Sequence, residues 1–236
     1  MSVNVSLPSW IANIPTDVPI LIAGPTASGK SSLAMSIAQS AGGCILNADA
    51  LQVYDNWRVL TARPNPVEEN SITHALYGHV NSKAEYSVGR WIRDIMPHLG
   101  KDIRPIIVGG TGLYFRALTR GLAKIPSTPP NVRALAIKKL NNEGLDALIA
   151  DLDNTTRSRL DLRNPMRVMR AWEVLTSTQR SIAQWQDETP SPLLGLAECS
   201  PILFDVDKDW LNERIKTRFD QMLACGAVEE AQQNLK

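Results

Sequence analysis

Short apolar runs alternate with longer segments of helical spacing along most of this chain. The apolar runs predict β-strands over residues 19–23, 44–48, 104–108 and 201–206. Apolar residues three and four positions apart predict helices over residues 32–41, 86–99, 113–119 and 210–223. This alternation predicts an α/β fold in which helices flank a parallel sheet. Residues 1–17 contain two prolines and are expected to be a loose lead-in.

The stretch over residues 121–192 has a different pattern. It opens with the linker-like sequence IPSTPP at residues 125–130, continues with helical spacing and carries no convincing strand. We therefore expect an all-helical insertion domain over residues 121–192. The core domain is then expected to consist of residues 1–120 and 193–236.

The segment GPTASGKS lies between the first predicted strand and the first predicted helix. Its G-x-x-x-x-G-K-S spacing is typical of a phosphate-binding loop, in which backbone N–H groups surround an anion at the positive end of a helix. Lys30 is expected to pair with terminal phosphate oxygens, and the Ser31 hydroxyl to join the shell of a Mg²⁺ ion. The loop makes the expected sheet P-loop NTPase-like. The candidate pyrophosphate- or nucleotide-binding residues are Gly24, Pro25, Thr26, Ala27, Ser28, Gly29, Lys30 and Ser31.

Asp49 follows the second predicted strand, and Thr111 follows the third. Because the carboxyl ends of parallel strands share one edge of a sheet, both residues are expected on the same rim as the phosphate loop. Asp49 is well placed there as a general base. Two reactions fit: a hydroxyl attacks a γ-phosphate, or a nucleophile attacks carbon and pyrophosphate leaves. The plainer interpretation of Asp49 is a cap or turn residue.

The composition of the chain indicates a globular protein but does not distinguish one function from another. The 236 residues carry a net charge of +1, with 44% hydrophobic and 21% charged residues, which is ordinary for a globular protein. The three cysteines fit neither a disulfide framework nor a zinc site, so we interpret them as buried thiols. No apolar run approaches a membrane span and no signal pattern begins the chain, so a cytoplasmic location without a membrane partner is expected.

Charge is more informative in its distribution than in its sum. Between residues 154 and 180 only Asp161 and Glu173 oppose a set of arginines, and lysine is absent. The arginines are Arg157, Arg159, Arg163, Arg167, Arg170 and Arg180. Guanidinium groups suit phosphate backbones, whereas a solvated helix face with internal ion pairs explains the same pattern equally well.

Four motifs in this order and at these distances resemble those of the tRNA dimethylallyltransferases, from about residue 19 to the end. They are GPTASGKS at residues 24–31, NADALQVY at 47–54, VGGTGLY at 108–114 and NPMRVMRAWEV at 164–174. The resemblance implies a P-loop core with a helical insertion that grips the tRNA anticodon stem-loop. It also implies transfer of a dimethylallyl group from dimethylallyl pyrophosphate to N6 of the adenosine 3′ of the anticodon, with release of pyrophosphate.

The same resemblance implies roles for individual residues. Asp49 is the expected base, Thr26 bonds the bridging or leaving oxygen, and either Arg214 or Arg218 neutralises the pyrophosphate, with Mg²⁺ as cofactor at Ser31. The expected partners are tRNA and dimethylallyl pyrophosphate, bound by a monomer. The residues expected to touch tRNA are Asp49, Ala50, Leu51, Gln52, Thr111, Met166, Arg167, Val168, Met169 and Arg170.

The sequence departs from the family pattern in three places. Ala50 and Leu51 stand where the family usually has Ser-Arg or Ser-Met, and only His74 remains of a His-His-Leu stretch. A helical pattern over 227–236 runs to the last residue, where relatives usually continue with a basic tail, so weaker tRNA binding is expected. Three alternatives stay open: an adenylate isopentenyltransferase, a P-loop small-molecule kinase and a non-catalytic nucleic-acid-binding module. The arginine-bearing insertion disfavours the first two, and Asp49 disfavours the third.

Overall fold

The computed structural model describes residues 9–100 and 103–235, and it divides the chain into two compact units. The sheet unit comprises residues up to 120 together with residues from 192 onward, and the helical unit comprises residues 121–191. The boundary expected from the sequence, between residues 192 and 193, differs from this one by a single residue.

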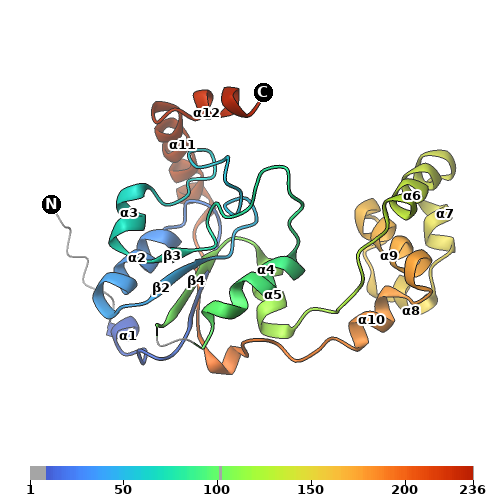
Figure 1. Ribbon diagram of the computed structural model, residues 1–236, viewed down its shortest axis with the longest axis horizontal. Helices are drawn as coiled ribbons and strands as arrows, with labels where there is room; N and C mark the ends of the chain where they lie inside the picture. The colour runs from blue at the N-terminus through green and yellow to red at the C-terminus, as the bar shows by residue number, and fades with distance from the viewer. Residues whose placement is uncertain (1–8, 101–102, 236) are drawn as a thin grey trace. The chain divides into compact units, whose positions relative to one another are not determined.

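A five-stranded sheet forms the centre of the sheet unit (Figure 1). Its strands are β1 (Ile20–Ala23), β2 (Cys44–Asn47), β3 (His74–Ala75), β4 (Pro105–Gly109) and β5 (Ser200–Leu203). Their order is β3-β2-β4-β1-β5, and every pairing is parallel. The α/β prediction of a parallel sheet flanked by helices is therefore confirmed.

Helices cover both faces of this sheet, so its strand residues alternate between two cores. Ile20 and Ile22 of β1 pack with Ile37 of α2 (Lys30–Ala41) on one face. Leu21 packs on the other face with Trp91 of α4 (Val88–Ile95) and with α5 (Gly112–Arg120). Strands buried on both sides contain no regularly spaced polar positions, which explains why they appear in the sequence as short continuous apolar runs.

The element boundaries differ from the predictions where local capping or tertiary pairing decides them. The expected loose lead-in contains a short helix, α1 (Ser9–Ala12), while residues 1–8 lie outside the described part. The helix predicted over 86–99 is α4 followed by a 3₁₀ turn (Met96–His98), because the Ser87 hydroxyl caps its start and Pro97 lacks an N–H. β5 ends three residues before the expected residue 206. β3 was not predicted, because two residues carry no periodicity.

Three further helices of the sheet unit bear on the site. They are α3 (Pro66–Ser71), α11 (Lys208–Ala224) and α12 (Ala227–Asn234), and a second 3₁₀ turn covers Leu196–Glu198. The Asp207 carboxylate accepts the N–H groups of Asp209 and Trp210, so α11 begins before the expected residue 210.

Five helices make up the helical unit, whose residues are all described and include no strand. They are α6 (Pro130–Glu143), α7 (Leu145–Ala150), α8 (Asn154–Arg159), α9 (Pro165–Thr178) and α10 (Ile182–Asp187). Their core centres on Ala136, Leu148 and Val168. The all-helical character of this stretch is as predicted. Across the described part of the chain, no helix combines the length and apolarity needed to cross a membrane.

Candidate active site

The phosphate loop, residues 24–31, joins β1 to α2 and depends on its two glycines. Gly29 has φ 100° immediately before α2, a conformation that side chains disfavour. Gly24 has φ 159°, and a Cβ added there would lie 2.6 Å from the Cβ of Phe204, which follows β5. The loop is therefore pressed against the end of the neighbouring strand and closes tightly over the start of α2.

Ser28 supplies a second sign that the loop is built for an anion. The residue is only 3% exposed, and its hydroxyl oxygen has no hydrogen-bond partner within the described residues. Buried polar groups in folded proteins are nearly always paired. The first N–H groups of α2 are likewise unpaired by the helix itself and sit at its positive end. A phosphate oxygen is the ligand that would satisfy both.

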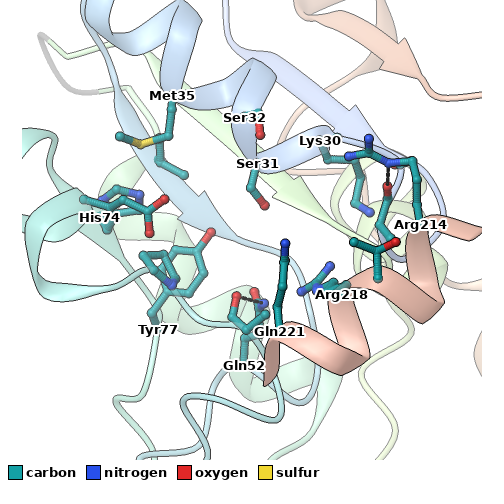
Figure 2. A pocket seen from close by; sticks show the side chains of 18 residues that line it. Lys30, Ser31, Ser32, Met35, Gln52, His74, Tyr77, Arg214, Arg218 and Gln221 are labelled. Carbon is teal, nitrogen blue, oxygen red and sulfur yellow. Dashed lines mark hydrogen bonds between the residues drawn. The ribbon is translucent and has the colours of Figure 1, made fainter. Parts of the chain in front are cut away.

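A cavity of about 420 Å³ opens beside the loop (Figure 2). Three cations line it: Lys30 from the start of α2, and Arg214 and Arg218 from α11. Ser31 and Tyr77 also face it. Further lining residues are Met35, Gln52, Glu68, His74, Thr217 and Gln221.

The cations of this cavity interact with one another and with Asp49. Lys30 donates a hydrogen bond from Nζ to the Pro25 carbonyl oxygen at 2.5 Å. Burial lowers the pKa of Lys30, the nearby Arg218 lowers it further, and Asp49 acts in the opposite direction. Burial also lowers the pKa of Arg218, again opposed by Asp49. Within the described residues, none of the three cations is in an ion pair, so their field is left for an anionic ligand.

The two arginines of α11 stand in different relations to the loop. Arg214 donates from Nε to the Ala27 carbonyl oxygen at 2.9 Å, and its guanidinium lies 4.8 Å from the centre of the Trp210 ring. It therefore braces the phosphate loop from outside. Arg218 makes no such contact, is half-buried and interacts electrostatically with Lys30 and Asp49. Of the two, Arg218 is the more available to a ligand.

Asp49 is held in place by the fully buried Asn47. The Asn47 amide accepts the Asp49 N–H at 2.8 Å and donates to the Asp49 carbonyl oxygen at 3.0 Å. The Trp91 indole N–H donates to the Asn47 carbonyl oxygen at 2.8 Å, and Asp49 Oδ1 accepts the Leu51 N–H at 2.9 Å. The backbone that carries the carboxylate is thus fixed by buried groups at the end of β2.

The carboxylate of Asp49 faces the phosphate loop across Gly110. A Cβ added at Gly110 would lie 3.8 Å from Asp49 Oδ2 and 3.6 Å from the Gly24 carbonyl oxygen. Thr111 lies alongside: its hydroxyl accepts the Ala50 N–H at 3.0 Å, and its own N–H donates to the Ala48 carbonyl oxygen at 3.2 Å. Asp49, Thr111 and the phosphate loop therefore share one edge of the sheet, as expected from the strand pattern.

Not every residue singled out in the sequence lies at the cavity. Among residues 49–52, only Gln52 lines it, and Thr26 and Thr111 do not. Residues 166–170 belong to α9 of the helical unit. Asp49 does not line the cavity, but it interacts electrostatically with Lys30 and Arg218, which do.

Sequence reasoning missed part of the cavity wall. Tyr77 lines the cavity because it follows β3, and the pairing of β3 with β2 has no signal in the sequence. Burial raises the pKa of the Tyr77 hydroxyl, and Asp49 adds to the effect, so the group is neutral and can donate a hydrogen bond. Thr217 and Gln221 did have a signal, because together with Arg214 and Arg218 they follow the i, i+3, i+4, i+7 spacing of one helix face.

The arginines of the helical unit differ in their partners. Four are in ion pairs inside the unit: Arg133 and Arg170 with Glu173, Arg159 with Asp187 and Arg180 with Glu188. Arg163 and Arg167 are exposed and have no ion pair within the described residues. Arg157 is half-buried. Internal ion pairs therefore account for part of the cluster, and phosphate binding by the exposed arginines stays a prediction.

Comparison with known proteins places these features in one family. The IPP transferase family model matches residues 52–236, and the isopentenyl transferase model matches residues 18–78. A protein of Ruegeria sp. (strain TM1040) named tRNA dimethylallyltransferase is 56% identical over 94% of this chain and 75% of its own length. One of the same name from Roseobacter denitrificans is 59% identical over 92% of this chain and 76% of its own length.

Two solved structures share the fold. A eukaryotic dimethylallyltransferase acting on tRNA has a TM-score of 0.75 at 26% identity, covering 92% of this chain and 55% of that one. The tRNA isopentenylpyrophosphate transferase of Bacillus halodurans has a TM-score of 0.57 at 25% identity, covering 92% of this chain and 69% of that one. The present chain therefore corresponds to little more than half of the eukaryotic protein.

Proposed function

The chain belongs to the IPP transferase family, and from this premise we propose that it is a tRNA dimethylallyltransferase. The reaction is transfer of a dimethylallyl group from dimethylallyl pyrophosphate to N6 of the adenosine 3′ of the tRNA anticodon. One observation carries the proposal: Asp49 faces the phosphate loop across Gly110, beside a cavity lined by Lys30, Arg214 and Arg218. In this proposal Asp49 accepts the proton, and the positive charge of the neighbouring cavity holds the diphosphate.

The diphosphate of the donor binds at the phosphate loop in this proposal. Lys30 and Arg218 line the cavity and have no ion pair within the part of the chain that the structure describes, and the Ser28 hydroxyl and the first N–H groups of α2 supply neutral donors. We assign charge neutralisation to Arg218 and loop bracing to Arg214, which is hydrogen-bonded to Ala27. These donors stabilise the charge that develops on the leaving group.

The chemical step forms one bond and breaks one. The N6 lone pair of adenosine attacks the allylic C1 carbon of the donor while the C1–O bond breaks, and its electron pair leaves with the diphosphate. The N6 proton passes to the Asp49 carboxylate, whose backbone Asn47 holds rigidly. Thr26, in the exposed part of the loop, is proposed to hydrogen-bond the leaving oxygen. The target base must leave its stack to reach this edge of the sheet.

A Mg²⁺ ion is a proposed cofactor, held by the Ser31 hydroxyl together with the diphosphate oxygens. The fit rests on the Ser31 side chain, which lines the cavity at the first turn of α2 and offers the oxygen ligand that Mg²⁺ prefers. The described residues contain no group of three or more His, Cys, Asp or Glu side chains that could hold a metal. Oxygens of the donor and water would complete the shell. When bound, the ion neutralises phosphate charge.

The tRNA anticodon stem-loop is the proposed partner of the helical unit. Arg163 and Arg167 are the arginines best suited to its phosphates, because they are exposed and unpaired within the described residues. Arg170 is engaged with Glu173 and with the Thr128 hydroxyl. A monomer in the cytoplasm completes the proposal.

The test is incubation of the protein with labelled dimethylallyl pyrophosphate, Mg²⁺ and bulk tRNA, followed by nucleoside analysis. Labelled N6-prenyladenosine 3′ of the anticodon is expected. In parallel incubations, label on AMP supplied in place of tRNA would instead show an adenylate isopentenyltransferase, and consumption of added ATP with a small-molecule acceptor would show a kinase. A Lys30→Ala variant, which keeps the fold but removes one phosphate contact, should lose most of the product.

A further inference from the structure

Glu230 of α12 reaches a part of the chain 170 residues away. Its Oε1 accepts the N–H groups of Arg58 at 2.6 Å and Val59 at 2.9 Å, and its Oε2 accepts that of Leu60 at 2.8 Å. Three consecutive N–H groups that converge on one carboxylate form an anion-binding nest. Burial alone would raise the pKa of Glu230, but these three hydrogen bonds outweigh it and hold the pKa below its ordinary value.

The turn held by Glu230 is also held from its inner side. Gln52 donates from Nε2 to the Thr61 carbonyl oxygen at 2.7 Å and to the Ala62 carbonyl oxygen at 3.1 Å. Gln52 and Ala62 both line the cavity. The backbone of this turn is therefore hydrogen-bonded by the Glu230 carboxylate and by the cavity-lining Gln52.

Two further contacts strengthen the clamp. The Asn234 amide donates to the Asn56 carbonyl oxygen at 3.0 Å, and the Asn56 amide donates to Asn234 Oδ1 at 2.6 Å. Arg58 also pairs with Glu69 of α3 at 3.1 Å. Because α12 follows α11 in the chain, two consecutive helices carry the cavity arginines and the clamp residues Glu230 and Asn234.

We infer that Glu230 is a positioning residue for the nucleic-acid acceptor, acting through the turn at residues 57–62 and through Gln52. The inference rests on the proposed function, because it places the acceptor against the segment that runs from Asp49 to Gln52. Within the described residues, neither Glu230 nor residues 57–62 form a hydrogen bond or ion pair with the phosphate loop. Although Gln52 and Ala62 line the same cavity as Lys30, loss of the clamp should therefore weaken tRNA binding more than pyrophosphate binding.

The experiment compares Glu230→Ala and Glu230→Gln with Glu229→Ala, which removes the same charge from an exposed neighbouring position on α12. Steady-state kinetics give kcat and KM for tRNA, calorimetry gives the affinity for pyrophosphate, and amide hydrogen exchange reports on Arg58, Val59 and Leu60. Binding of an anticodon stem-loop RNA is measured in parallel. Glu230→Gln guards against misfolding, because it keeps one acceptor oxygen for Arg58 and Val59.

We expect Glu230→Ala to raise KM for tRNA by about tenfold, because the lost charge-assisted hydrogen bonds are expected to change the affinity for tRNA by that factor. The kcat and the pyrophosphate affinity should stay near those of the wild type, exchange at residues 58–60 should accelerate, and Glu230→Gln should recover part of the KM. Glu229→Ala should match the wild type in every measurement.

Accelerated exchange with an unchanged KM would overturn the inference, since the clamp would then be purely structural. An equal loss of pyrophosphate affinity would overturn it as well, because the effect would not be confined to the acceptor side. A wild type that transfers no label would overturn the proposed function instead, and the stem-loop affinities of the same variants would then decide whether Glu230 positions an RNA.

Discussion

Arg214 and Arg218 of the sheet unit differ from the arginines around Glu173 of the helical unit in whether they have a carboxylate partner. In the sheet unit, Arg214 and Arg218 line a cavity and have no ion pair within the described residues, while Glu230 is satisfied by backbone N–H groups. In the helical unit, Glu173 is 2% exposed and is satisfied by arginine side chains, Arg133 at 3.5 Å and Arg170 at 3.7 Å. Arginine therefore lines a cavity at one of these places and neutralises a buried carboxylate at the other.

This difference shows that basic composition alone does not identify a phosphate-binding surface. What distinguishes the cavity cations is the way their neighbours are arranged. Carboxylates that could pair with them are occupied elsewhere or held at a distance, so positive charge remains preorganised for an anion. In α9 the buried Glu173 captures its arginine, because an unpaired carboxylate in the core would cost more than the lost surface charge.

The largest expected effect comes from replacing Asp49 of the sheet unit, which is the proposed general base. Asp49→Asn should lower kcat by about a thousandfold, since a positioned general base contributes factors of about 10²–10⁴. Affinities for tRNA and pyrophosphate should change little. Rates come from nucleoside analysis, and Asp220→Asn on the exposed side of α11 is the matched control. Retained turnover would remove Asp49 from the role of base.

The next contrast lies within the sheet unit, between the two arginines of α11. Arg218→Ala should weaken pyrophosphate binding by at least about tenfold, because it removes a half-buried cation beside Lys30. Arg214→Ala should have a smaller effect, since that side chain braces Ala27. Calorimetry with pyrophosphate measures both, and Lys216→Ala removes an exposed charge from the same helix as a control. The reverse ranking would contradict the assignment of roles.

A smaller effect is expected where the helical unit meets RNA. Arg167→Ala should raise KM for tRNA severalfold and reduce the slope of log affinity against log salt by about 1, as loss of one phosphate contact does. Arg170→Ala should leave that slope nearly unchanged and lower the free energy of unfolding by about 1–3 kcal/mol, because the buried Glu173 loses one of its two ion-pair partners. Salt-dependent binding and urea unfolding separate the two. Equal salt slopes would show that both arginines contact phosphate.

The phosphate loop and Asp49 were predictable because their signals are local. A glycine spacing and a strand end are encoded within a few residues, and the parallel sheet then brings both to one edge. Which arginines form ion pairs was not predictable. Arg170 pairs with Glu173, one helical turn away, because Glu173 is buried and needs a partner. Whether Glu173 is buried depends on how α6, α7 and α9 pack together, and the charge pattern carries no information about that packing.

The wall formed by β3 and the turn at residues 57–62 was out of reach for the same reason. His74-Ala75 becomes a strand only because β2 offers an unpaired edge. The turn is fixed by Glu230, which lies 170 to 172 residues away in the chain. Long-range contacts of this kind leave no periodicity, so the sequence predicts the reactive edge of the sheet better than the cavity that surrounds it.

The smallest expected effect concerns how two neighbouring carboxylates of α12, Glu230 and Glu229, respond to acid. The folded pKa of Glu230 lies below its ordinary value of 4.5, so its hydrogen bonds stabilise the fold fully above pH 4.5. That contribution is lost as the pH falls from 4.5 through the lowered folded pKa, because the unfolded state then binds the proton first. Glu230→Gln should therefore reduce the loss of unfolding free energy between pH 7 and pH 3, measured by urea titration. Glu229→Gln, with an exposed carboxylate, should keep the wild-type dependence, and a Glu230→Gln curve parallel to the wild type would mean that the nest does not hold the ionised carboxylate.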